Sequence, residues 1–332
     1  VTGVQTVCSS DLDVQRFAMQ QAFDELYDLL ESLLGGKRGQ VQGRFMARKI
    51  FYGTRNVISS MVHNRTKFAP GEAPGLNDAC VSLYQFTKSI TPVTTYRLIN
   101  GFLSKCFDMP GMPAKLVDKQ TLQGKLVEIK YQTFSRWCGS EGLEKIVTSF
   151  KSKDVRHLPI EIEGYYLGLV YEGPDKTFAL IHGLQDLPDP EMAKFCRPIT
   201  LTDLLHHAVY RVAHKYPGII TRYPVTGVGS SFPARAWLKT TIDSEKRHEL
   251  DPSTWEKIPG AYAREYPIHG KLFYDTLSPH PSRLARLGAD HDGDTASWTA
   301  SMSDEVINDE FPQLITKRRF YMDTSGEFIH DL

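Results

Sequence analysis

Cysteine is scarce in this chain of 332 residues, and the few cysteines present are not spaced for metal binding or cross-linking. The five are scattered, with no Cys-x-x-Cys pair: Cys8, Cys80, Cys106, Cys138 and Cys196. Zinc ribbons need closely spaced cysteine pairs, and disulfide scaffolds are short and rich in cysteine. The pattern therefore argues against both and favours reduced thiols in an intracellular protein.

Long apolar runs and net charge are also absent. No stretch approaches the roughly 20 apolar residues that a membrane-spanning helix needs. The chain carries 39 basic and 39 acidic residues, so its formal net charge is zero. We therefore expect a cytoplasmic protein with no membrane contact. Zero net charge does not exclude a nucleic-acid partner, because the local distribution of basic residues matters more than their sum.

Three carboxylates alternate near the C-terminus, at Asp290, Asp292 and Asp294, with Gly293 among them. A short turn can direct all three side chains at one point. Converging anionic oxygens are unfavourable unless a hard cation neutralises them. Mg²⁺ suits such a site, since it accepts a few carboxylates and leaves room for water and substrate phosphates.

Two simpler explanations of the three alternating carboxylates are an EF-hand calcium loop and a solvated Asp-Gly turn. An EF-hand calcium loop needs Gly at its sixth position and Glu at its twelfth. Counted from Asp290, those positions hold Thr295 and Ser301, so the register excludes that loop. A solvated Asp-Gly turn is common and stays open on these residues alone.

A basic segment lies near the other end of the chain. Residues 36–67 contain no acidic residue, and aromatic residues are interleaved with the basic ones. The eight basic residues are Lys37, Arg38, Arg44, Arg48, Lys49, Arg55, Arg65 and Lys67. Such a run is often only a solvated face, but clustered cations also favour contact with nucleic-acid phosphates.

Residues 288–294 resemble the Ala-Asp-Phe-Asp-Gly-Asp signature of the largest (β′-type) subunit of multisubunit RNA polymerases. Further segments resemble the same family in the same order. Residues 36–58 are similar to its Gly-Lys-x-Gly…Tyr-Ser-Gly-Arg-Ser-Val-Ile segment, without a gap. Residues 204–224 are similar to its helix followed by His-Pro-Val…Asn-Arg-x-Pro-Thr, and residues 75–106, more loosely, to the helical stretch between.

This resemblance implies an α+β fold built on a double-psi β-barrel with a large helical and β insertion and an N-terminal helix. The expected barrel domain combines residues 37–62 and 216–302, and residues 63–215 form the insertion. Residues 13–36 are the expected N-terminal helix and 303–332 a C-terminal segment. Because the chain begins with Val1, we expect a fragment. Residues 1–12 resemble translated sequencing-adapter sequence, so we expect them to be a non-native leader.

The resemblance also implies the catalytic subunit of a DNA-directed RNA polymerase, which transfers nucleotides by a two-metal Mg²⁺ mechanism. Asp290, Asp292 and Asp294 would hold the metal and be catalytic, and Arg222 would bind the nucleotide. The basic segment, through Arg44, Lys49 and Arg55, would contact nucleic acid. Activity would require a β-like partner and other subunits, with template DNA, nascent RNA and nucleoside triphosphates.

The sequence departs from the family pattern at two positions beside the carboxylates. Gly288 stands where the family has Asn, and His291 where it has Phe, which puts the recognition of the ribose hydroxyls in question. The spacing from Arg222 to Asp290 is also long, so residues 239–281 are expected to carry a further insertion. Such divergence looks like the polymerase subunits of large DNA phages, which would place the protein in a host cytoplasm.

Two other functions stay open. One is a non-catalytic module that binds nucleic acid or a divalent cation, with the acidic turn in a structural role. The other is a metal-dependent phosphohydrolase, although a haloacid-type enzyme would carry its carboxylates at the end of an early parallel strand.

Hydrophobic periodicity gives the local expectations. A helix is expected from Asp13 to Leu34, and a strand over residues 49–62 with a turn at Gly53. Helices are expected over residues 76–107, and strands with one helix over 120–195. A further helix is expected over residues 202–215, capped by Thr202.

Overall fold

The computed structural model describes residues 3–36, 38–45, 50–61, 73–107, 113–225, 227–316 and 322. It divides the chain into two compact units, Val1–Phe51 and Tyr52–Leu332. Among the described residues, no helix combines the length and the apolar character needed to cross a membrane.

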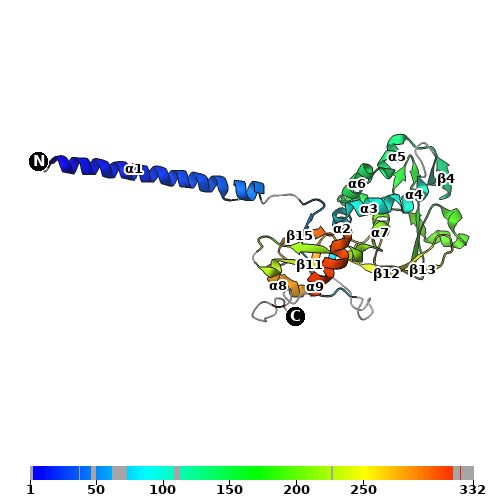
Figure 1. Cartoon of the computed structure of the whole chain (residues 1–332). Helices are drawn as coiled ribbons and strands as arrows, with labels where there is room; N and C mark the ends of the chain where they lie inside the picture. Colours follow the sequence, from blue (N-terminus) through cyan, green and yellow to red (C-terminus); the bar gives the residue numbers. More distant parts are fainter. Residues whose placement is uncertain are drawn as a thin grey trace. The chain divides into compact units, whose positions relative to one another are not determined.

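The first unit is dominated by one helix, α1 (Gly3–Leu34), followed by a π-helical turn, η1 (Val41–Phe45). Figure 1 shows α1 as a single uninterrupted helix. The predicted helix over residues 13–34 is confirmed, and α1 begins earlier, within the predicted leader. Side chains from residue 11 to residue 34 are exposed, including large apolar ones such as Phe17, Phe23 and Leu30.

The second unit contains a six-stranded sheet in the order β1-β15-β10-β11-β2-β14. Its strands are β1 (Thr54–Val57), β2 (Asp78–Ser82), β10 (Gly218–Thr221), β11 (Ser231–Lys239), β14 (Leu277–Pro279) and β15 (Thr295–Ala300). All neighbours are antiparallel except the parallel pair β11 and β2.

The chain just beyond β1 nearly closes this sheet into a barrel. The backbone N–H of Ile58 donates to the carbonyl oxygen of Asp294 at 2.8 Å, while Ile58 also forms a parallel bridge with Leu277 of β14. β1 and β14, the two end strands of the sheet, therefore approach each other at Ile58. The expected α+β class is confirmed, together with a nearly closed, six-stranded, barrel-like sheet.

Two further sheets come mainly from the middle of the chain. One has five strands in the order β13-β12-β8-β7-β9, and the other has four in the order β4-β3-β6-β5. The five strands are β7 (Leu169–Glu172), β8 (Thr177–Ile181), β9 (Cys196–Pro198), β12 (Ser244–Leu250) and β13 (Lys257–Pro267). The four are β3 (Ala114–Val117), β4 (Gly124–Val127), β5 (Glu161–Ile162) and β6 (Tyr165–Tyr166).

Helices of this unit pack against the sheets through one continuous apolar core, which includes Phe86, Leu98, Ile220, Phe232 and Trp298. The helices before the barrel's second part are α2 (Leu83–Ser89), α3 (Thr91–Ile99), α4 (Phe102–Cys106), α5 (Tyr131–Cys138), α6 (Ser140–Ser149) and α7 (Leu201–Val209). The later ones are α8 (Leu284–Leu287) and α9 (Phe311–Thr316). Figure 1 shows α3, α4, α5 and α6 together, and α3 contacts both α4 and α6.

Local structure differs from the sequence-based expectation in three places. Asp78–Ser82 is the strand β2, not helix, because a short apolar run buried on both faces has no periodicity that separates strand from helix. The helix α5 was not expected. The cap of α7 is Thr200, not Thr202, since Thr200 forms a capping box with Asp203.

Strands also cross the predicted domain boundaries. β2 lies in the expected insertion yet pairs with β11 and β14 of the barrel. Conversely, β12 and β13 lie within residues 216–302 yet belong to the five-stranded sheet. They fall in the stretch, residues 239–281, that was expected to be a further insertion. The boundaries themselves remain a prediction.

Trp298 is the largest fully buried side chain of the described residues, and Gly218 leaves the space for it. The two residues lie on the paired strands β15 and β10, and a Cβ on Gly218 would lie 2.5 Å from Cζ2 of Trp298. The indole Nε1 donates to Oγ of Ser89 at 3.2 Å, which fixes the ring against the end of α2. This contact joins the helices to the centre of the barrel.

We expect Gly218→Ala to lower the free energy of unfolding by about 1–3 kcal/mol, because the new methyl group overpacks a fixed indole. Urea unfolding measures the change. Gly227→Ala is the matched control, since no atom lies within 4 Å of a Cβ there, and should shift stability by about 1 kcal/mol or less. Equal effects of the two substitutions would mean that Trp298 does not pack on Gly218.

Candidate metal centre

Two glycines shape the loop that connects α8 to β15. α8 ends at Gly288, whose φ of 63° lies in the left-handed region, and Gly293 has a φ of 115°. Glycine adopts both conformations without the Cβ clash that other residues would suffer. The chain therefore reverses between α8 and β15 within a few residues, and the three aspartates lie on this reversal.

The structure brings Asp290, Asp292 and Asp294 together. One carboxylate oxygen from each lies within 4.8 Å of the others. Asp290 and Asp292 are exposed, and Asp294 is half-buried. With Arg222 and Gly288 they line a cavity of about 350 Å³.

Arg222 holds one of the three carboxylates in place. It follows β10, and its backbone N–H donates to the carbonyl oxygen of Ser230 at 3.0 Å. Its guanidinium approaches Oδ2 of Asp294 through Nε at 3.0 Å and through Nη2 at 2.8 Å. The backbone N–H of Asp290 donates to the same oxygen at 3.3 Å, so Asp294 has three donors.

Among the residues that the structure describes, no cation is bonded to Asp292 in this way. Its pKa is raised above the ordinary value by a hydrogen bond with Asp290, then by the negative charge of Asp290 and of Asp294. Like charges at short range disfavour ionisation of the Asp292 carboxyl group. A divalent cation would remove this repulsion, and an all-oxygen donor set that includes several carboxylates is the set that Mg²⁺ accepts.

The predicted nucleic-acid contacts lie in different parts of the chain. Arg55 is exposed on β1, and its Nε donates to Oγ1 of Thr295 at 2.9 Å, directly after the acidic loop. Arg44 is exposed on η1 in the first unit. Lys49 lies outside the described residues. The structure therefore brings together the three aspartates, Arg222 and Arg55.

Sequence reasoning missed Arg283, which ties the turn η8 (Pro281–Arg283), just before α8, to the segment that precedes β2. It is 1% exposed and donates from Nε to the carbonyl oxygen of Leu76 at 3.1 Å and from Nη2 to Oδ1 of Asn77 at 2.9 Å. Its guanidinium carbon lies 4.7 Å from the ring centre of Phe232. Arginine is rarely buried, so a single arginine outside a motif gave no signal of this role.

The chain matches no known protein-family model, and no curated protein matches it.

Asp290→Asn should return the pKa of Asp292 toward the ordinary aspartate value, since it removes the negative charge of Asp290 and replaces one acceptor oxygen by an amide donor that favours ionised Asp292. Carboxyl ¹³C resonances followed through a pH titration measure this. In the parent, Asp292 should keep its proton to higher pH than an isolated aspartate, and Mg²⁺ should displace that proton.

Asp304→Asn provides the control, because Asp304 is an exposed acid at the start of the C-terminal helical segment. This substitution should leave the Asp292 titration unchanged. An Asp292 titration that is identical in the parent and in Asp290→Asn would contradict the proximity of the two carboxylates.

Proposed function

We propose that this chain is the catalytic β′-like subunit of a DNA-directed RNA polymerase, an enzyme that transfers nucleotides with Mg²⁺. Under this proposal the nearly closed barrel is a double-psi barrel. Its parallel β11–β2 pair and the closure at Ile58 are compatible with that topology.

One observation carries the proposal. The segments that resemble the polymerase family at residues 36–58, 204–224 and 288–294 are distant in sequence, and parts of all three meet at one end of β15. β15 pairs with β1 on one side and with β10 on the other. Arg222, Arg55 and the three aspartates consequently lie around the start of that strand.

The donor chemistry fits the cofactor that the resemblance implies. Asp290, Asp292 and Asp294 would hold Mg²⁺, and each contributes an oxygen to the cluster. When bound, Mg²⁺ supplies the positive charge that activates a 3′-hydroxyl and stabilises the leaving pyrophosphate. The protein's own part is to position the carboxylates and to orient the substrate.

Arg222 is suited to act on both the carboxylates and the nucleotide. Its Nε and Nη2 are used on Asp294, while Nη1 has no acceptor among the described residues. Nη1 lies 3.6 Å from where a Cβ on Gly288 would be. An Asn at that position would therefore adjoin Arg222, and Gly288 leaves the space open. Arg222 alone would then present donors to the sugar.

The strand geometry disfavours the phosphohydrolase alternative. A haloacid-type site carries its carboxylates at the end of a parallel strand, whereas this loop leads into β15, which is antiparallel to both its neighbours. A cation-binding module without catalysis has the same donor set, so an activity measurement must separate it from the polymerase.

The test is RNA synthesis by the chain purified with the subunits that co-assemble with it. Asp292→Asn should lower nucleotide incorporation by roughly a hundredfold or more while assembly is unchanged, because charge that stabilises the transition state is lost. Arg222→Lys should also lower the rate, since an ammonium does not replace a planar fork.

Asp304→Asn is the matched control and should retain parental activity. Full synthesis by Asp292→Asn would overturn the assignment of the site. A chain that binds Mg²⁺ through the triad but assembles with no polymerase subunit would instead support the cation-binding module.

The proposed phosphate contacts of the basic residues lead to a separate prediction about the salt dependence of DNA binding. Each phosphate neutralised on duplex DNA releases about 0.9 counterion, so the combined change of Arg44→Gln and Arg55→Gln should lower the salt slope of binding by about two. Sequence preference should hardly change, since phosphate contacts position without specifying. Arg136→Gln, at an exposed arginine of α5, should leave the slope as it is. An unchanged slope in the double variant would make Arg44 and Arg55 structural.

A further inference from the structure

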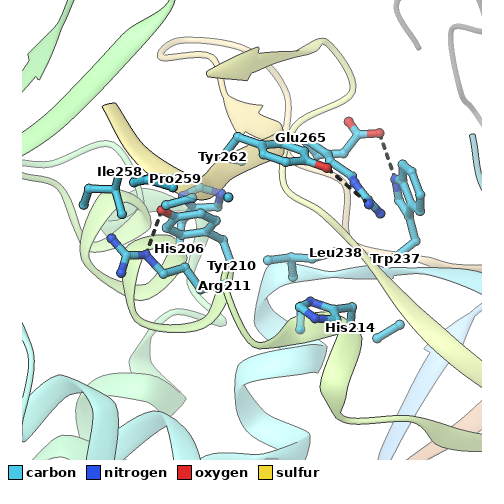
Figure 2. Close-up of a pocket in the computed structure, with 16 residues that line it drawn as sticks. His206, Tyr210, Arg211, His214, Trp237, Leu238, Ile258, Pro259, Tyr262 and Glu265 are labelled. Carbon is cyan, nitrogen blue, oxygen red and sulfur yellow. Dashed lines mark hydrogen bonds between the residues drawn. The ribbon is translucent and has the colours of Figure 1, made fainter. Parts of the chain in front are cut away.

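A second cavity, of about 430 Å³, lies between β13, β11, the end of α7 and the following turn η6 (Ala213–Lys215). Figure 2 shows Tyr262 of β13 and His214 of η6 on opposite sides of it. Eight consecutive residues, 258–265, line the cavity, and β13 is the outer strand of its sheet. Its volume is in the range of small-molecule sites.

Aromatic rings form much of the wall, and one of them is held rigidly. Nε1 of Trp237 donates to Oε1 of the buried Glu265 at 3.1 Å (Figure 2). The other oxygen of Glu265 accepts from Nζ of Lys239 at 3.1 Å. The negative charge of Glu265 is thereby balanced by Lys239, and the orientation of the Trp237 ring is fixed. Such rings provide planar surfaces on which a flat ligand can stack.

Arg264 brings positive charge to this aromatic wall. Its guanidinium carbon lies 5.1 Å from the ring centre of Trp237 and 5.8 Å from that of Tyr262. Within the described part of the chain no carboxylate pairs with it. Nη2 of Arg264 donates to the hydroxyl oxygen of Tyr262 at 3.5 Å, and a guanidinium that lies over aromatic rings can present its other donors to a phosphate or carboxylate.

His206 adds a polar group that the fold does not use. It lines the cavity, is 2% exposed, and stacks on Tyr210 with ring centres 5.2 Å apart. Neither ring nitrogen has a hydrogen-bond partner among the residues described. Burial, followed by the charge of His207, lowers the pKa of His206 to about 3, so the ring is neutral and offers one donor and one acceptor.

We propose that this cavity binds a small planar aromatic molecule that carries a phosphate or carboxylate group. The ring stacks against the aromatic wall and hydrogen-bonds to His206, and the anionic group pairs with Arg264. A cationic ligand is disfavoured, because Glu265, the only carboxylate among the described residues that line the cavity, is already bonded to Lys239 and Trp237. The site is separate from the acidic loop and does not depend on the proposed polymerase activity.

Two classes of ligand combine a planar aromatic ring with an anionic group, namely nucleotides and aromatic carboxylates. Calorimetric titration of the full chain with adenosine 5′-monophosphate and with indole-3-carboxylate separates them. EDTA in the buffer prevents metal-dependent binding at the aspartates. Adenosine and inorganic phosphate, each carrying half of the required chemistry, should bind more weakly than adenosine 5′-monophosphate.

Arg264→Gln should weaken binding of the preferred ligand by about tenfold or more, a loss of roughly 1.4 kcal/mol or more. The Arg264 side chain is exposed, so the fold should not depend on it. His206→Phe should also weaken binding while thermal stability stays close to that of the parent, because a phenyl ring can keep the stacking contact with Tyr210. Arg136→Gln should bind as the parent does.

Either of two results overturns the proposal. One is that neither ring-bearing anion binds the parent with a dissociation constant below about 1 mM. The other is that binding is unaffected by Arg264→Gln and His206→Phe, which would place the ligand elsewhere. A preference for one ligand over the other identifies the source.

Discussion

The hydrogen-bond ladder of β15 is the interaction on which the candidate site depends. β15 pairs with β1 on one side and with β10 on the other, and Trp298 anchors it in the core. Because antiparallel register is set residue by residue, this double pairing determines where the acidic loop ends and where the chain leaves β10. A slip of one residue would turn Trp298 to the opposite face of the sheet and move Arg222 away from Asp294.

The carboxylates of the interior and those of the acidic loop differ in whether a cation is bonded to them. Burial alone would raise the pKa of Glu249, but His207, Tyr210 and Arg211 bond to it and lower that pKa to about 2. Glu265 likewise forms an ion pair with Lys239. Asp290 and Asp292, in contrast, have no cation among the described residues. Fold stability gains nothing from this repulsion, which is why the loop is the strongest candidate for a site that binds a cation.

β11 belongs to both regions of interest. Its first half pairs with β10, which leads to Arg222, and its second half pairs with β2 and carries Trp237 into the aromatic cavity. The two regions nevertheless differ in chemistry, since one is lined by three clustered carboxylates and the other by aromatic rings and an arginine that pairs with no carboxylate among the described residues. We therefore expect them to bind different partners: a hard cation at the loop and a flat organic anion at the cavity.

The sequence by itself determined the long helix and the three aspartates, because periodicity and close spacing are local properties, and its resemblance to a known family gave the α+β class. It also singled out Arg222, through its resemblance to a family motif. Only the tertiary structure decided that β2 is a strand, that Arg55 adjoins the acidic loop, and that Arg283 is buried against Leu76 and Asn77. The cavity around Trp237 and His206 was likewise beyond sequence reasoning. Its lining comes from four elements whose proximity depends on how the sheets pack, and no single segment carries a pattern that reports such long-range contacts.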